Sequence, residues 1–122
     1  WPGSGRPDED GAHGNILNMP LPPESGGAEM KAAYEAQAFP RLRAFNPELI
    51  IISAGFDAHQ DDPLANLNWS TQDFAWITKQ LCKLADELCA GRIVSTLEGG
   101  YDLNALSAAC KAHVEELIEA SK

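Results

Sequence analysis

The chain has 122 residues, of which 44% are hydrophobic, which is enough for one packed core and allows at most one domain. Its formal net charge of -9 leaves no basic patch for phosphates, so we expect no direct nucleic-acid binding. An acidic surface tolerates a cationic partner such as a lysine-rich tail, although acidity is also a common way for a protein to stay in solution.

Cysteine usage and hydropathy bear on the compartment. The three cysteines, Cys82, Cys89 and Cys110, lie in helix-like segments without C-x-x-C spacing. We interpret them as reduced thiols rather than as disulfides or zinc ligands. No stretch is long and apolar enough to span a membrane, and we recognise no signal peptide. We therefore expect a cytoplasmic protein without a membrane partner, or a nuclear one if the source is eukaryotic.

The first part of the chain predicts a loop, a short strand and a helix. Residues 1–14 are rich in Gly and Pro and begin without Met, which we interpret as a loop in a piece of a longer protein. The stretch "NILNMPL" at 15–21 fits a short strand that ends at "PPESGG". Between residues 28 and 45, apolar residues recur every three or four positions, as on one face of a helix that Pro40 should kink or split; they are Met30, Tyr34, Ala38, Leu42 and Phe45.

The rest of the chain predicts two strands that alternate with two helices. The continuous apolar run "ELIIISAGF" at 48–56 is typical of a parallel strand covered on both faces, and "GRIVSTLEGGY" at 91–101 is a second buried strand. A helix over 70–88 should begin at Ser70 or Thr71. The last helix, over 104–120, should turn its apolar side inward, with Leu106, Cys110, Val114 and Leu117. This order indicates an α/β fold with a parallel sheet and right-handed crossovers.

Each predicted strand is followed by a motif of glycine and polar residues. The stretch "GFDAH" follows the first strand and "EGGY" the second, and ligands of open α/β sheets bind just beyond the carboxyl ends of the strands. Glycines there allow the backbone close to a ligand, and Asp57 and Tyr101 would project into one crevice. The alternative is structural, with Gly99 and Gly100 as a turn, Asp57 as a cap and Tyr101 as a cover of the core.

Three stretches carry a family resemblance: "PELIIISAGFDAHQDDPL", "LEGGYDLNAL" and the leading "WPGSG" with "NMPLP". In order and register they resemble the C-terminal part of the histone deacetylase superfamily, whose zinc amidohydrolases include acetylpolyamine deacetylases and acetoin-utilisation proteins. The motifs are most similar to class II-like and bacterial members. The resemblance implies a three-layer, parallel-sheet arginase/deacetylase-like fold. It also implies that residues 1–122 are the C-terminal portion of a single catalytic domain whose upstream part is absent.

The resemblance implies a catalytic Zn²⁺ ion, bound by an Asp-x-His pair and by one further aspartate, which is Asp57 here. Three protein ligands leave zinc an open position for water and the substrate carbonyl. The run Asp57-Ala58-His59 imitates the ligand pair, but in the family only the aspartate of this motif binds zinc. We therefore expect His59 to support the site or to fix its loop. A structural K⁺ ion in the full-length parent is also compatible with the resemblance.

The resemblance also implies how substrate is bound. Tyr101 resembles the family's tyrosine that donates a hydrogen bond to the acetamide oxygen, which stabilises the oxyanion of the transition state. Trp1 and Leu64 map to the walls of a narrow apolar tunnel, with Gly99 and Gly100 giving room at its base. An apolar Leu64 argues against the acidic gatekeeper of dedicated acetylspermidine enzymes, although ordinary packing also explains it. The implied substrate is an acylated lysine peptide or a small acylated amine.

Part of the implied site is missing. The family's Asp-x-His ligands and its tandem histidines, which act as general base and acid, lie before position 1. They are not replaced by His13, in the glycine-rich loop, or by His113, which we place at the core edge or surface. We therefore predict a zinc-dependent deacetylase whose residues 1–122 are inactive alone.

Two alternatives stay open. One is a non-catalytic remnant or interaction module that keeps the deacetylase fold. The other is an arginase-like manganese hydrolase, which is disfavoured because that site needs Asp-x-Asp where this chain has Asp57-Ala58-His59.

Overall fold

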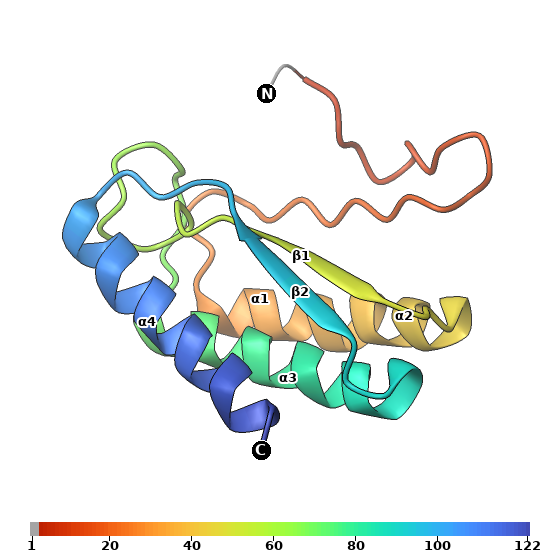
Figure 1. The fold of residues 1–122 in the computed structure, drawn as a ribbon. Coiled ribbons are helices and arrows are strands. Elements are labelled where there is room, and N and C mark those ends of the chain that lie inside the picture. The colour runs from red at the N-terminus through yellow and green to blue at the C-terminus, as the bar shows by residue number, and fades with distance from the viewer. Residues whose placement is uncertain (1–2) are drawn as a thin grey trace.

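The computed structural model describes residues 3–122, so Trp1, one of the predicted tunnel residues, lies outside the described part (Figure 1). The elements in chain order are α1 (Gly27–Ala33), the π-helical turn η1 (Tyr34–Ala38), α2 (Phe39–Phe45), β1 (Ile50–Ala54), α3 (Thr71–Cys89), β2 (Ile93–Leu97) and α4 (Leu103–Ala120). Strands β1 and β2 are parallel, with Ile50 opposite Ile93 and Ala54 opposite Leu97. The predicted parallel α/β arrangement is therefore confirmed.

The predicted helix over 28–45 is divided as expected at Pro40. Proline lacks an N–H donor, and its ring clashes with the carbonyl four residues earlier in an α-helix. The chain widens here into η1, in which the N–H of Phe39 donates to the carbonyl of Tyr34. Met30 and Phe39 are buried as the pattern predicts. Phe45 is not: it is 68% exposed, because the helix ends there and Asn46 takes a left-handed conformation.

Helix α3 begins where the sequence predicts. The backbone N–H of Ser70 donates to Asp73 Oδ2 at 2.9 Å, so the side chain of Asp73 in the first turn caps the helix. Lys31 of α1 lies 2.8 Å from Asp73 Oδ1 and ties the two helices together. Burial raises the pKa of the Asp73 carboxyl, but Lys31 and Ser70 outweigh burial and hold the pKa below its usual value.

The sheet is covered on one face only within residues 3–122. All the helices lie on the same side of β1 and β2 (Figure 1). On the other side Ile51 is 66% exposed and Val94 is 55% exposed. The prediction of strands covered on both faces is therefore wrong for this part of the chain. An apolar run indicates that a strand is buried, but it does not show which segment covers each face.

Two further expectations differ from the structure. Residues 15–21 form no strand, since no other strand pairs with them in the described part of the chain and Pro20 lacks a donor. Helix α4 buries Ala105, Ala109 and His113 most deeply. Of the residues predicted to face inward, Leu106 and Cys110 pack against the core, Leu117 is half-buried and Val114 is 41% exposed.

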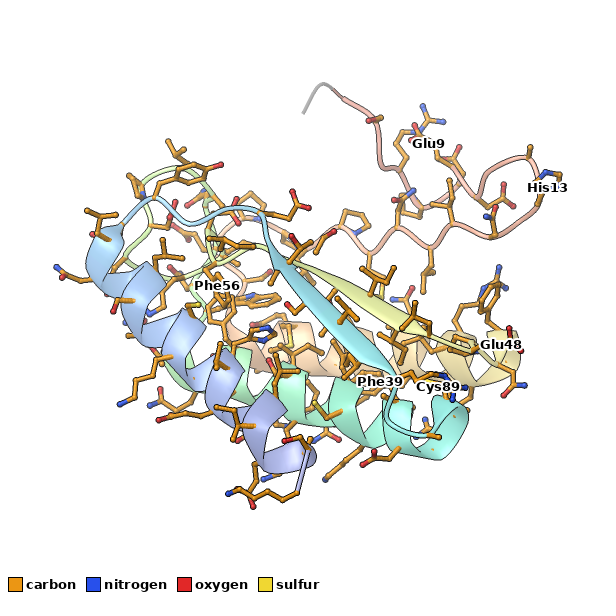
Figure 2. All side chains as sticks on the ribbon, viewed as in Figure 1. Glu9, His13, Phe39, Glu48, Phe56 and Cys89 are labelled. Atoms are coloured by element: carbon orange, nitrogen blue, oxygen red, sulfur yellow. The ribbon has the colours of Figure 1, made fainter. Side chains whose placement is uncertain are left out.

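The core consists of two adjoining apolar clusters. One lies between the sheet and the helices α1 to α3 and includes Phe39 and Cys89 (Figure 2). The other joins the end of β1 to α3 and α4, with the rings of Phe56 and Phe74 5.4 Å apart. Cys82 and Cys89 are buried free thiols, and Cys110 is half-buried. None of the helices in residues 3–122 is long and apolar enough to cross a bilayer.

Candidate functional site

The carboxyl ends of β1 and β2 lie side by side, as the parallel sheet requires. The N–H of Glu98 donates to the carbonyl of Ala54 at 3.0 Å, and the N–H of Phe56 donates to the carbonyl of Gly99 at 2.9 Å. The ladder thus continues past both strands into the two predicted motifs. "GFD" and "EGGY" therefore meet at one edge of the sheet.

The carboxylate of Asp57 rests against two glycines of these motifs. A Cβ atom on Gly99 would lie 3.2 Å from Asp57 Oδ1 and 3.3 Å from Oδ2, and one on Gly55 would lie 2.9 Å from Oδ1. Side chains at either position would crowd the carboxylate. Three other aspartates, Asp62, Asp73 and Asp102, each accept backbone N–H donors, whereas no hydrogen bond reaches the Asp57 carboxylate within residues 3–122. Asp57 is half-buried and its oxygens are free of protein donors in that range.

Tyr101 lies two residues beyond Gly99, and its side chain is 56% exposed. Gly100 before it has φ +131°, and a Cβ atom there would lie 2.9 Å from Leu106 Cδ1 and 3.2 Å from Phe56 Cβ. Only glycine suits this conformation and this packing. Asp102 after it caps α4, accepting the N–H of Ala105 at 2.8 Å. The loop is therefore fixed on both sides of Tyr101.

Asp62 connects the loop after β1 to the loop after β2. Its Oδ1 accepts the N–H of Leu64 at 2.9 Å, and its Oδ2 accepts the N–H of Tyr101 at 2.7 Å and that of Asp102 at 3.4 Å. Burial raises the pKa of the Asp62 carboxyl, but these donors outweigh burial and hold the pKa below its usual value. Sequence reasoning gave Asp62 no role. The contact to Leu64 follows the turn pattern typical of Asp, but nothing local signals the contact to Tyr101.

Leu64 and His59 occupy the same loop in different ways. Leu64 is 67% exposed, and it shares the Asp62 carboxylate with Tyr101, which brings these two predicted site residues into one neighbourhood. His59 is buried: its Nδ1 accepts the N–H of Asp61 at 3.2 Å, and its Nε2 lies 3.2 Å from Thr71 Oγ1. With Nδ1 accepting, Nε2 carries the hydrogen and donates to Thr71. One ring nitrogen thus holds the turn of the loop itself, and the other ties the loop to the start of α3.

The described residues do not complete a metal site. No group of three or more His, Cys, Asp or Glu side chains that could hold a metal ion occurs within residues 3–122. A catalytic zinc site needs three protein ligands, and the edge described above offers the single carboxylate of Asp57. His13 lies on the N-terminal loop, next to Gly14, whose carbonyl accepts from Arg41 of α2 (Figure 2). These residues fit one corner of a zinc site and not the whole of it.

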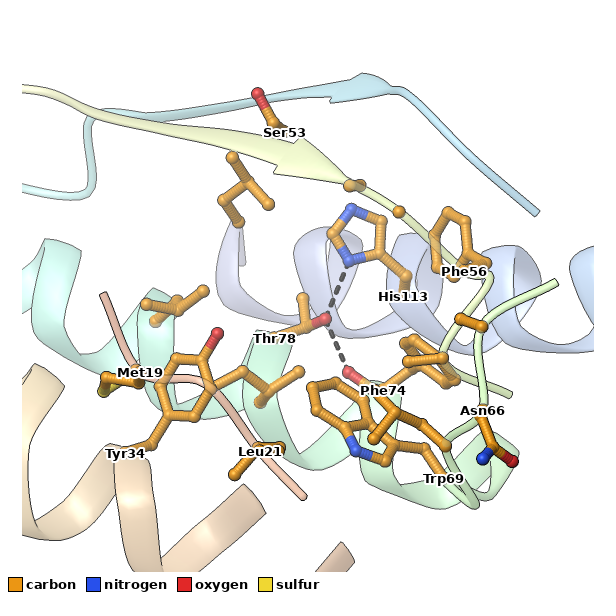
Figure 3. Close-up of a pocket in the computed structure, with 18 of the residues that line it drawn as sticks. Met19, Leu21, Tyr34, Ser53, Phe56, Asn66, Trp69, Phe74, Thr78 and His113 are labelled. Carbon is orange, nitrogen blue, oxygen red and sulfur yellow. Dashed lines mark hydrogen bonds between the residues drawn. The ribbon is translucent and has the colours of Figure 1, made fainter. Parts of the chain in front are cut away.

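His113 is buried between α3, α4 and β2, which corrects its expected place at the core edge or surface. Its Nδ1 lies 2.7 Å from Thr78 Oγ1, and its Nε2 lies 2.8 Å from Ser95 Oγ. Thr78 donates its hydroxyl hydrogen to the carbonyl of Phe74 at 2.7 Å, so it accepts from His113 (Figure 3). Burial lowers the pKa of His113. This histidine links three elements of the core.

A cavity of about 640 Å³ lies between β1, α3 and residues 19–23 (Figure 3). Its walls are mainly apolar and aromatic, with Met19, Leu21, Tyr34, Trp69 and Phe74 among them. Trp69 Nε1 is buried without a partner in the described part of the chain. Neither Asp57 nor Tyr101 lines this cavity. Gly55, Phe56 and Ala58 do line it, so the cavity adjoins the edge at which the predicted site residues meet without including Asp57 or Tyr101.

Sequence comparison identifies relatives of the whole chain. The histone deacetylase domain family matches residues 1–117. Histone deacetylase 14, chloroplastic, of Arabidopsis thaliana is 43% identical over 110 residues, covering 88% of this chain and 26% of that protein. Type-2 histone deacetylase 1 of Dictyostelium discoideum is 44% identical over 106 residues, covering 87% of this chain and 7% of that protein.

Solved structures agree with the sequence comparison. The crystal structure of the HDA15 HD domain superposes with a TM-score of 0.88 at 32% identity, covering 98% of this chain and 33% of that one. An acetylpolyamine aminohydrolase from Burkholderia pseudomallei gives a TM-score of 0.81 at 26% identity, covering 94% of this chain and 33% of that one. The chain thus spans a third or less of each of these relatives. With its parallel sheet, its two strand-end motifs and a family match over nearly its full length, the chain belongs to the histone deacetylase family.

Proposed function

We propose that residues 1–122 form the C-terminal portion of a deacetylase catalytic domain that hydrolyses the acetamide of an acylated lysine or a related acylated amine. The observation that carries this proposal is the Asp57 carboxylate, which accepts no hydrogen bond within residues 3–122 and lies at the strand ends beside Gly99. A half-buried carboxylate without a donor suits a cation as its partner. Family membership supplies the reaction class.

Asp57 is proposed as one zinc ligand, with the remaining ligands and the general base supplied from outside residues 1–122. A zinc ion bound there would polarise the substrate carbonyl and lower the pKa of a bound water. Because these residues hold one corner of the site, we assign no catalytic activity to residues 1–122 alone. Asp57 contributes charge to that corner, and Gly55 and Gly99 leave the space that its carboxylate needs.

Tyr101 is proposed as the donor to the oxyanion. Its phenol hydroxyl would bond more strongly to the developing negative charge than to the neutral amide oxygen, and this difference lowers the barrier. Leu64, exposed on the adjoining loop, would contact the apolar stem of the substrate, and we extend the same proposal to Trp1. The proposed substrate comes from one of two chemical classes, acyl-lysine peptides or acylated polyamines, and the match to an acetylpolyamine aminohydrolase supports testing both. A location in the cytoplasm remains a sequence-based prediction.

The test compares Tyr101→Phe with wild type in the protein expressed from its complete reading frame. Loss of one hydroxyl should lower turnover on an acetyl-lysine peptide or an acetylated polyamine by about a hundredfold or more. The Michaelis constant should change much less, because the bond strengthens in the transition state.

The chain offers a matched control for this substitution. Tyr34→Phe removes a hydroxyl from the cavity, away from the site, and should leave turnover unchanged. Zinc content, measured by elemental analysis, should be the same in all three proteins. Equal turnover in Tyr101→Phe and wild type, or no turnover on either substrate by the zinc-loaded wild type, would refute the proposed function.

A further inference from the structure

The Asp62 side chain joins the two loops that form the candidate site through hydrogen bonds. One carboxylate oxygen serves its own turn through Leu64, and the other accepts the backbone N–H of Tyr101 at 2.7 Å across 39 residues of sequence. The turn needs only the first of these contacts. The contact to the N–H of Tyr101 is not needed for the turn, and Tyr101 is the residue proposed to donate to the oxyanion.

The surroundings of Asp62 explain why this contact is specific. Asp62 forms no ion pair with Lys or Arg in the described chain, so its charge is directed at backbone N–H groups. Hydrogen bonds to an ionised carboxylate are shorter and about twice as strong as neutral ones. Gly100 fixes the backbone before Tyr101, and the capping residue Asp102 fixes it afterwards. The N–H of Tyr101 itself is held by Asp62.

We propose that Asp62 is a positioning residue for Tyr101, setting the place of its hydroxyl relative to the substrate carbonyl. This inference rests on the proposed function, in which that hydroxyl stabilises the oxyanion. Asp62 does not touch the substrate and acts through the backbone of Tyr101. A catalytic group displaced by about 1 Å can cost about a hundredfold in rate, so a contact that fixes this loop governs turnover.

Asp62→Asn is the substitution that leaves one acceptor oxygen in place of two. The amide oxygen can accept from Leu64 or from Tyr101 but not from both, and because Asn favours the turn contact two residues on, we expect the contact to Tyr101 to be the one lost. In the protein expressed from its complete reading frame, we expect turnover to fall by about tenfold to a hundredfold. The Michaelis constant should stay within about twofold, since Asp62 makes no contact with the ground-state substrate. Asp61→Asn, in the same loop but without contact to Tyr101, is the matched control and should retain wild-type turnover.

A double-substitution cycle distinguishes positioning from general stability. If Asp62 acts through the Tyr101 hydroxyl, Asp62→Asn should cause no further loss of turnover in a Tyr101→Phe background. An equal fold-loss in both backgrounds, or no loss in either, overturns the inference while leaving the proposed function intact, provided that Tyr101→Phe alone is slow. Wild-type turnover in Tyr101→Phe overturns both together. If Asp62→Asn does not fold, Asp62→Ser, whose hydroxyl can still accept the N–H of Leu64, enters the same cycle with the same expectations.

Discussion

Asp57 and Asp62 lie on one loop, yet their carboxylates have opposite surroundings. Asp62 accepts three backbone N–H groups, whereas no donor reaches Asp57 within residues 3–122. A carboxylate that is partly removed from water without a donor is destabilising unless a cation approaches it. Asp62 therefore fixes the loop, whereas the Asp57 carboxylate has no protein donor within residues 3–122 and could accept a cation.

Asp57→Ala should abolish stoichiometric zinc in the protein expressed from its complete reading frame, because the remaining ligands no longer define the geometry of the metal. Elemental analysis after dialysis measures this directly. Activity should disappear with the metal. Since Asp57 accepts no hydrogen bond within residues 3–122, the free energy of unfolding of the metal-free variant should be equal to that of metal-free wild type or slightly higher, by up to about 0.5 kcal/mol. Full zinc occupancy in Asp57→Ala would contradict the assignment, and Asp61→Ala serves as the control that retains zinc.

At the scale of elements, His113 joins α3, α4 and β2 through hydroxyl groups. Thr78 has one hydroxyl hydrogen, which it gives to Phe74, so Nδ1 of His113 must donate and Nε2 accepts from Ser95. This arrangement satisfies a neutral imidazole. Burial disfavours the charged form and lowers the pKa below the ordinary 6.5.

This histidine predicts a pH dependence of stability. The unfolded chain binds the proton more tightly than the folded one, so the contribution of His113 is complete above about pH 6.5 and is lost as the pH falls through its lower folded pKa. Chemical denaturation between pH 7.5 and 5 should therefore show wild type losing stability relative to His113→Gln as the pH falls. Subtracting the free energy of unfolding of His113→Gln from that of wild type at each pH cancels the contribution of the other histidines. Parallel stability curves would contradict this account.

The sequence predicted elements best where the signal was local. Ser70 marked the start of α3, Pro40 marked the division at η1, and the Gly-containing motifs marked the strand ends that meet at the sheet edge. Local patterns did not predict which face of α4 is buried, because Val114 and His113 are neighbours and the choice depends on what packs against each.

The same reason explains the parts of the candidate site that sequence reasoning missed. The contact between Asp62 and Tyr101 joins residues 39 apart, and no spacing rule connects an Asp-Pro turn to a Gly-Gly loop. The meeting of "GFD" and "EGGY" at one edge of the sheet was predicted because parallel strands place their carboxyl ends together, but the packing of Asp57 against Gly99 was not. Residues 15–21 were predicted as a strand from composition, but a strand also needs a partner.

At the scale of the whole molecule, residues 3–122 leave much apolar surface open. Ile51 and Val94 lie on the uncovered face of the sheet, and Leu97 at the end of β2 is 60% exposed. Each strand has a neighbour on one side only in this range, so the outer edges carry unpaired backbone groups. Such edges and faces favour association with other chains.

Residues 1–122 produced alone should associate as their concentration rises, which light scattering coupled to size exclusion would measure. Ile51→Lys with Val94→Lys should reduce association by placing charge on the open face. Phe45→Lys with Ile118→Lys makes the same change in charge at exposed helix positions and should reduce association much less. A monomer with a sharp two-state melt would contradict this prediction.

The contact between Asp62 and Tyr101 also orders events in folding. It closes a loop of the chain that contains α3 and β2. The conformational entropy lost on closing so long a loop must be offset by favourable contacts within it. Pairing of β2 with β1 already closes most of this loop, so we expect the contact to form after the βαβ unit is in place. We therefore expect the hydroxyl proposed for catalysis to be among the last groups fixed on folding and among the first released when the protein opens locally.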